Sequence, residues 1–183
     1  MKIYVDTNIV SGLAKKDFNI EIINYFYKIL EYRKNGIIDL YVSELTANEL
    51  KKIPEEFKYH HNVIYLLLNN ISIKPKKYHN LITHGLGGSS GSLITHGLLG
   101  TNDPILHKIE EIIPQKNNLI KKEGRQKDIE HLFQCYKNNL DIFWTEDVKT
   151  ILNYHLELKQ IGLHVLNSEN LYHLIAKKQT MEE

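Results

Sequence analysis

The alternation of two apolar patterns along the chain predicts an α/β fold built on a parallel sheet. Short runs rich in apolar, β-branched and aromatic residues, typical of buried strands, alternate with stretches in which apolar residues recur every three or four positions, as in amphipathic helices. Such alternation favours parallel strands joined by right-handed crossovers, with functional sites at the carboxyl ends of the strands. Asp6 and Asp147 are expected at that edge.

The first elements form two strand-and-helix pairs. The run that ends at Asp6 predicts a buried strand followed by a turn and a helix, and Gly36 is expected to stop the next helix. Ser43 has the residue type and the place of a helix N-cap. The expected elements are a strand at 2–5, a helix at 20–33, a strand at 37–42 and a helix that Ser43 caps and Pro54 ends.

The last third repeats the alternation. Ile129, Leu132, Phe133 and Tyr136 have helical spacing, and a compact apolar strand follows them. The expected elements are a helix over Asp128–Leu140, a strand over Asp141–Thr145, a helix over Val148–Leu158, a strand over Leu163–Leu166 and a final helix from Ser168, as its cap, to about Lys178.

The middle of the chain is less regular. Helices are expected over His60–Asn69 and Asn102–Ile113, with a strand over Ile71–Ile73. Leu81–Leu86 is repeated at Leu93–Leu98, and the residues between the copies, Gly-Gly-Ser-Ser-Gly-Ser, have the composition of a flexible linker. A local duplication and an engineered segment both explain the repeat, so no function is built on it.

Length and composition indicate a single domain. The chain has 183 residues, of which 42% are hydrophobic and 25% charged, enough for one substantial core. A formal net charge of +1 neither indicates nor excludes a nucleic-acid partner. Cys135 is the only cysteine, which favours a reducing cytoplasm. No stretch approaches the ~20 apolar residues of a membrane span, so no membrane association is expected.

Four carboxylates are candidates for one site: Asp6, Glu49, Asp128 and Asp147. Gathered at a sheet edge they would repel one another, each close pair by about 3 kcal/mol at ~5 Å and an effective dielectric constant near 20. A divalent cation removes that repulsion, and hard oxygen ligands suit Mg²⁺ or Mn²⁺. Such a site is suited to phosphodiester hydrolysis. Acidic residues at strand ends are nevertheless common in α/β proteins, so this pattern alone is only moderately specific.

Two motifs in the first third resemble those of the PIN-domain family. The segment Ile3-Tyr4-Val5-Asp6-Thr7-Asn8 is similar to the family's opening motif, a strand followed by Asp-Thr-Asn. Residues 41–50 resemble the second motif, a strand and a Ser followed by Thr and a Glu-Leu pair on a helix. On that pattern Glu49 is the ligand, whereas Glu44 aligns with a variable position.

The C-terminal third resembles the rest of the pattern. Asp128-Ile129 is expected to open a helix, and the strand over 142–147 ends in Thr-x-Asp at Asp147. The resemblance makes Asn8 and Thr145 polar supports that orient the carboxylates. It covers roughly residues 1–53 and 126–176. The chain departs from the family where small alanines often follow the third Asp, since it has His131, Phe133 and Gln134 there.

The resemblance implies a fold, an activity and partners. The fold is a PIN-like doubly wound α/β/α sandwich with a central parallel sheet of about four or five strands, in a single domain over 1–183 with an insertion at about 55–125. The activity is a Mg²⁺- or Mn²⁺-dependent endoribonuclease acting on single-stranded or structured RNA. In toxin members of the family a small antitoxin protein is the partner, and a homodimer is also compatible. A PIN-like nucleic-acid-binding or scaffold module without catalysis is the alternative, and a DNA-acting nuclease also stays open.

Each candidate also has a structural interpretation. Asp6, Asp128 and Asp147 all have the residue type of a helix N-cap, and the alternative for Glu49 is a solvated helix face. Asp141 starts its strand and is expected at the opposite edge.

Other functional classes fit less well. The ten histidines, including His60-His61, His84 and His96, match no zinc spacing, and the glycines over 85–91 form no phosphate loop. Aspartyl-phosphate chemistry of the haloacid dehalogenase type would need an Asp where Asn8 stands. Basic groups at 15–16, 74–77 and 121–127 are explained equally well by an RNA path and by solvated loops.

Overall fold

A four-stranded, all-parallel sheet forms the centre of the molecule. The structure is a computed structural model that describes residues 1–69, 103–113 and 119–182. The strands stand in the order β2-β1-β3-β4, with all three neighbouring pairs parallel. Their bounds are β1 (Lys2–Val5), β2 (Asp39–Tyr41), β3 (Ile142–Trp144) and β4 (Val165–Leu166). The expected parallel α/β fold is therefore confirmed at this level.

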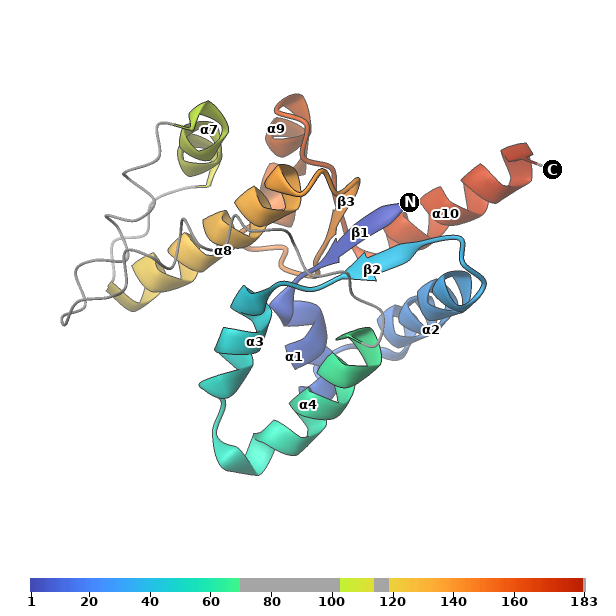
Figure 1. Cartoon of the computed structure of the whole chain (residues 1–183), viewed down its shortest axis with the longest axis horizontal. Coiled ribbons are helices and arrows are strands. Elements are labelled where there is room, and N and C mark those ends of the chain that lie inside the picture. The colour runs from blue at the N-terminus through green and yellow to red at the C-terminus, as the bar shows by residue number, and fades with distance from the viewer. Residues whose placement is uncertain (70–102, 114–118, 183) are drawn as a thin grey trace.

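Helices join and cover these strands (Figure 1). The cores on the two faces of the sheet draw on different helices, α2 and α10 on one and α7, α8 and α9 on the other, which is compatible with an α/β/α sandwich. The helices of the described ranges are α1 (Thr7–Lys15), α2 (Ile20–Lys34), α3 (Glu44–Lys51), α4 (Glu55–Asn69), α7 (Pro104–Ile112), α8 (Leu119–Lys137), α9 (His155–Gln160) and α10 (Ser168–Glu182).

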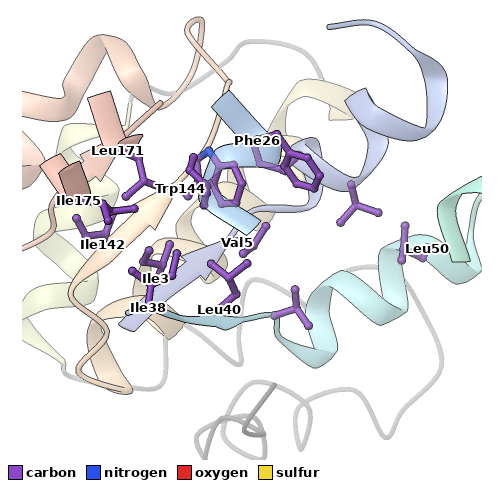
Figure 2. Packing of buried hydrophobic residues seen from close by; sticks show 14 residues of the cluster. Ile3, Val5, Phe26, Ile38, Leu40, Leu50, Ile142, Trp144, Leu171 and Ile175 are labelled. Atoms are coloured by element: carbon purple, nitrogen blue, oxygen red, sulfur yellow. The ribbon is translucent and has the colours of Figure 1, made fainter. Parts of the chain in front are cut away.

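One face of the sheet packs against α2 and α10. Figure 2 shows Trp144 of β3 beside Phe26 of α2, and the ring centroids are 5.7 Å apart. Leu171 and Ile175 of α10 lie beside Ile142 in the same cluster (Figure 2). Burial of large apolar side chains of this kind stabilises each by about 1.5–3 kcal/mol.

The alternate residues of the strands face the other helices. Tyr4 lies between two residues of the first cluster and turns to the opposite face, where its ring stacks on Phe143 at 5.2 Å. Leu106 and Ile109 of α7 and Leu132 of α8 complete this second core, all fully buried. The period of two along β1 therefore directs Tyr4 towards α8.

Helix ends agree in part with the expected caps. The Ser43 side chain accepts a hydrogen bond from the Thr46 amide, as expected for the N-cap of α3. At α10 the expected cap, Ser168, is wrong, because the Asn167 side chain accepts from the Asn170 amide at 2.9 Å. Ser168 instead accepts from the Trp144 indole at 3.0 Å, which ties α10 to β3.

Two helix starts and one whole helix differ most from the expected elements. Helix α4 begins at Glu55 rather than at His60, and α8 begins at Leu119, so that Asp128 lies inside the helix and does not open it. The single helix expected over Val148–Leu158 is wrong. A turn after Asp147 leads into a 3₁₀ segment, η2 (Leu152–Tyr154), and then into α9.

Part of the expected insertion lies outside the described residues. This applies to the strand at Ile71–Ile73 and to the repeated six-residue segment at 81–86 and 93–98. Among the residues that the structure does describe, none of the helices has both the length and the apolar character that a membrane crossing requires.

Candidate active site at the carboxyl edge of the sheet

The site lies where the strand order reverses. β1 comes first in the chain but stands between β2 and β3, and Val5 pairs with Trp144 in register. The Asp6 amide donates to the Trp144 carbonyl at 3.0 Å, which continues this pairing by one residue. Asp6 and Thr145 are therefore neighbours at the carboxyl edge. In open α/β sheets this reversal point is where a binding crevice forms.

The hydroxyl of Thr145 connects the groups at this edge. Thr145 is fully buried and donates to Asp6 Oδ2 at 2.7 Å. Its oxygen accepts from Asn8 Nδ2 at 2.7 Å and from the Asp147 amide at 3.1 Å. Asn8 in turn accepts from the Glu146 amide at 3.2 Å. Thr145 thus contacts the Asp6 carboxylate directly, and Asn8 contacts Thr145.

Asp6 stands at the N-cap position of α1, but its side chain makes no capping hydrogen bond there. It is 7% exposed, and burial is the largest cause that raises the pKa of its carboxyl above the usual value. The negative charge of Glu49 raises this pKa further, while His131 and Thr145 oppose the shift without cancelling it. The Asp6 side chain therefore does not cap α1 in this structure.

Glu49 reaches the same region from α3. Its Oε2 lies 3.1 Å from His131 Nε2, and its Oε1 lies 3.2 Å from the Lys127 ammonium. Burial would raise the pKa of this carboxyl, but the hydrogen bond and charge of His131 outweigh it, with smaller contributions from Thr7 and Lys127. The pKa falls to about 2. Glu49 is therefore ionised at neutral pH and paired on both oxygens.

His131 connects Glu49 to the core through Tyr4. The Tyr4 hydroxyl donates to Ser43 Oγ at 2.6 Å, and His131 Nδ1 lies 2.6 Å from the same phenol oxygen. Nε2 faces the ionised Glu49 carboxylate, which only accepts, so Nε2 is the ring nitrogen that donates there.

Burial and the neighbouring acids act on the pKa of His131 in opposite directions. Its burial lowers the pKa, but the hydrogen bond with Glu49 and the charges of Asp6, Glu49 and Glu130 outweigh burial and raise it. His131 is only 2% exposed. The ring is therefore buried among acids and held in a fixed orientation.

Asp147 is held by its own loop. Its Oδ1 accepts from the Thr150 amide at 3.0 Å, and its Oδ2 accepts from the Thr150 hydroxyl. The alternative role of Asp147 as the cap of a helix is not realised, because its side chain closes the turn that stands in place of the expected helix. Both carboxylate oxygens of Asp147 thus accept from Thr150 in this structure. The backbone amide of Asp147 donates to the Thr145 hydroxyl, which in turn donates to Asp6.

Asp128 and Glu130 both lie inside α8. Asp128 is half-buried inside α8, so its alternative role as an N-cap is excluded. Glu130 is 6% exposed, and its pKa is raised by burial and by the charge of Glu49, against His131 and Lys127. Within residues 1–69, 103–113 and 119–182, no three His, Cys, Asp or Glu side chains are grouped closely enough to hold a metal ion.

The sequence did not single out Lys127 and His131 as members of the site. A spacing of four places both on one face of α8, and they flank the motif residue Asp128. The helical spacing of these two residues beside an acidic motif was the signal that could have indicated them. Placing them at Glu49 also requires knowing that this face of α8 meets α3, which only the tertiary structure shows.

The remaining candidates have other positions. Asp141 Oδ2 accepts from the Lys2 amide at 2.7 Å, at the opposite edge of the sheet as expected. Arg125 donates from Nε to the Ile113 carbonyl at 2.9 Å and also to the Glu110 carbonyl, so its guanidinium joins α8 to α7. Lys74, Lys76 and Lys77 lie outside the described residues.

The paired histidines of α4 face different surroundings, because neighbouring residues of a helix point about 100° apart. His60 is exposed, whereas His61 is 1% exposed and its Nδ1 lies 2.8 Å from the Phe57 carbonyl. His84 and His96 lie outside the described residues.

Comparison with known proteins adds no relative. A scan against protein-family models finds no match to this chain, and a search of curated proteins finds none.

Proposed function

We propose that this chain is a PIN-like, Mg²⁺- or Mn²⁺-dependent endoribonuclease that hydrolyses phosphodiester bonds of single-stranded or structured RNA. The observation that carries the proposal is a pair of interacting acids, the buried Asp6 and the partly buried Glu49, at the reversal point of a parallel sheet. The motif resemblance at both ends of the chain supports the same assignment.

The donor chemistry of the pair fits a hard divalent cation. Mg²⁺ commonly binds through one or two carboxylates and keeps several water ligands. The raised pKa of Asp6, caused by burial and by Glu49, means that a further positive charge beside the pair would be stabilising. Asp6 and Glu49 would hold the cation, and Asp147 would join them on release from Thr150. When bound, the cation would polarise the scissile phosphate and lower the pKa of a bound water.

The protein's own groups would prepare this chemistry. Thr145 orients the Asp6 carboxylate through a 2.7 Å hydrogen bond, and Asn8 fixes the Thr145 hydroxyl. His131 orients Glu49. Preorganised carboxylates of this kind need no rearrangement when the substrate arrives, which is where such sites gain their rate.

The test is cleavage of labelled RNA with Mn²⁺ by the wild type and by Asp6→Asn, with an EDTA control. We expect the variant to lose at least about 100-fold in rate, because loss of an outer hydrogen-bonding partner alone costs about 10–100-fold at metal sites. Asp141→Asn is the matched control, since this acid caps the opposite edge of the same sheet. Equal activity of Asp6→Asn and wild type would exclude the nuclease assignment.

A second function is favoured by the pairing of the acids. Both oxygens of Glu49 and both oxygens of Asp147 already have partners within the chain. A PIN-like nucleic-acid-binding or scaffold module without catalysis would retain this arrangement. RNA binding without cleavage of RNA or single-stranded DNA, at any Mn²⁺ concentration, would support this alternative.

The partners follow from the same proposal. If the chain is a toxin, a small antitoxin protein would cover the acid pair and block cleavage. Light scattering of the purified chain, alone and with the product of a neighbouring gene, tests both that complex and a homodimer. A cytoplasmic location remains part of the proposal and rests on the single buried Cys135.

A further inference from the structure

The two oxygens of Glu49 are held by partners of different kinds. Oε2 lies 3.1 Å from Nε2 of His131, whose ring is 2% exposed. Oε1 lies 3.2 Å from the Lys127 ammonium, whose side chain is 39% exposed. One partner is therefore buried, and the other reaches the site from the surface.

The buried partner cannot leave without cost. The His131 ring packs edge-on against the Tyr4 ring at 5.8 Å, and its Nδ1 lies 2.6 Å from the Tyr4 oxygen. Withdrawing the imidazole would break its close contacts with the buried Tyr4 hydroxyl and with Glu49 Oε2, which is unfavourable in a water-poor site. The contact between His131 and Oε2 is therefore a fixed part of the site.

The surface partner can leave easily. A lysine ammonium is a compact, strongly hydrated charge on a flexible stem, and partly exposed ion pairs contribute little free energy. The side chain can hold Oε1 or turn into water while α8 stays in place. Oε1 of Glu49 is therefore the exchangeable position of the pair.

The Lys127 ammonium lies where its positive charge opposes the negative charges of nearby acids. The charge of Lys127 acts on two acids, Glu49 and Glu130, and lowers the pKa of each. Arg125, a nearby base on α8, is directed to carbonyl oxygens at the end of α7 instead. Among the described residues at Glu49, Lys127 is thus the exchangeable cation.

We propose that the Lys127 ammonium is an internal cation that occupies the exchangeable oxygen of Glu49 in the metal-free protein and that a divalent cation displaces. This inference rests on the proposed function, because it takes Asp6 and Glu49 as the divalent-cation site. It makes Lys127 a determinant of metal affinity, and it leaves the displaced ammonium beside the site.

The test is calorimetric titration of Mn²⁺ into wild type, Lys127→Met and Lys127→Arg. Lys127→Met is expected to bind Mn²⁺ about two- to fivefold more tightly, the range set by partly exposed ion pairs. Lys127→Arg keeps the competing charge and is expected to stay close to wild type. Lys58→Met removes a comparable ion pair, with Glu55 on α4, and should leave the affinity unchanged.

Thermal unfolding gives a second readout that does not depend on activity. Without metal, Lys127→Met should unfold at a slightly lower temperature than wild type, and the stabilisation by Mn²⁺ should be larger than in wild type. If wild type binds Mn²⁺ and Lys127→Met binds it equally or more weakly, the internal-cation role is wrong. If wild type neither binds Mn²⁺ nor cleaves RNA, the proposed function fails, and this inference fails with it.

Discussion

Tyr4 provides the sharpest test of the buried hydrogen-bond chain at the site. Its side chain is fully buried, and its hydroxyl contacts Ser43 Oγ and His131 Nδ1, each at 2.6 Å. Burial raises the pKa of the phenol well above its usual range, so the group stays protonated. Tyr4→Phe keeps the ring and its stacking on Phe143 but removes both hydrogen bonds.

The expected loss of stability follows from what the hydroxyl leaves behind. Nδ1 of His131 loses the contact at its buried ring nitrogen, and an unsatisfied buried donor costs about 1–3 kcal/mol, more when it is charged. Ser43 Oγ still accepts from the Thr46 amide, so its share is smaller. We expect a decrease of about 2–3 kcal/mol in the free energy of unfolding, measured by urea denaturation. For a chain of this size that corresponds to about 4–10 °C in Tm.

Tyr136→Phe is the matched control for this prediction. Tyr136 packs at the edge of the same core, and its hydroxyl has no hydrogen-bond partner in the part of the chain that the structure describes. Its replacement should change stability by less than about 0.5 kcal/mol. A Tyr4→Phe protein as stable as this control would show that the Tyr4–His131 contact contributes nothing.

Three further predictions concern the charged groups. The pKa of His131 is raised above 6.5, so its contribution to stability is complete below about pH 6.5 and is lost as pH rises through the raised pKa. Urea titrations from pH 6 to 9 should show this decrease in the free energy of unfolding in wild type and not in His131→Gln. The pKa of Glu49 falls from 4.5 to about 2, so Glu49 contributes up to about 3 kcal/mol to the free energy of unfolding. This contribution is present above pH 4.5 and is lost as pH drops towards 2. Glu49→Gln should therefore lose less stability than wild type over that range, and an identical acid transition would contradict the pairing of Glu49 with His131 and Lys127. Asp147→Ala should cost about 1 kcal/mol through the lost Thr150 contacts. If Asp147 also binds the cation, Asp147→Ala weakens Mn²⁺ binding and Thr150→Val does not, whereas equal affinities would leave Asp147 a role in its turn alone.

Features fixed by neighbouring residues were predicted well. The strand at 2–5 and the cap at Ser43 depend on local apolar pattern and residue type, and both are confirmed. The support of Asp6 by Thr145 was expected from the motif resemblance, and in the structure the parallel pairing of β1 with β3 brings the two residues together.

Features that depend on distant contacts were not predicted. The start of α8 at Leu119 has no apolar stripe to mark it, and contacts from Arg125 to the end of α7 help to hold it there. Ser168 has the residue type of a cap, but the Trp144 indole engages it, and Asn167 takes the role. The place of His131 in the site could not be foreseen either, since it requires the packing of α8 against both β1 and α3.

The composition of the site changes the electrostatic argument for a metal. From sequence, the divalent cation was expected to relieve repulsion among unpaired carboxylates. In the structure the acids Asp6, Glu49 and Glu130 come with two internal bases, Lys127 and His131. Part of the repulsion among the carboxylates is therefore already neutralised. The binding free energy of a divalent cation is then only the difference between its own attraction to the acids and that of the Lys127 ammonium it replaces. The proposed site should accordingly bind Mn²⁺ weakly enough to be tuned by a single lysine, which is what makes the Lys127→Met titration decisive.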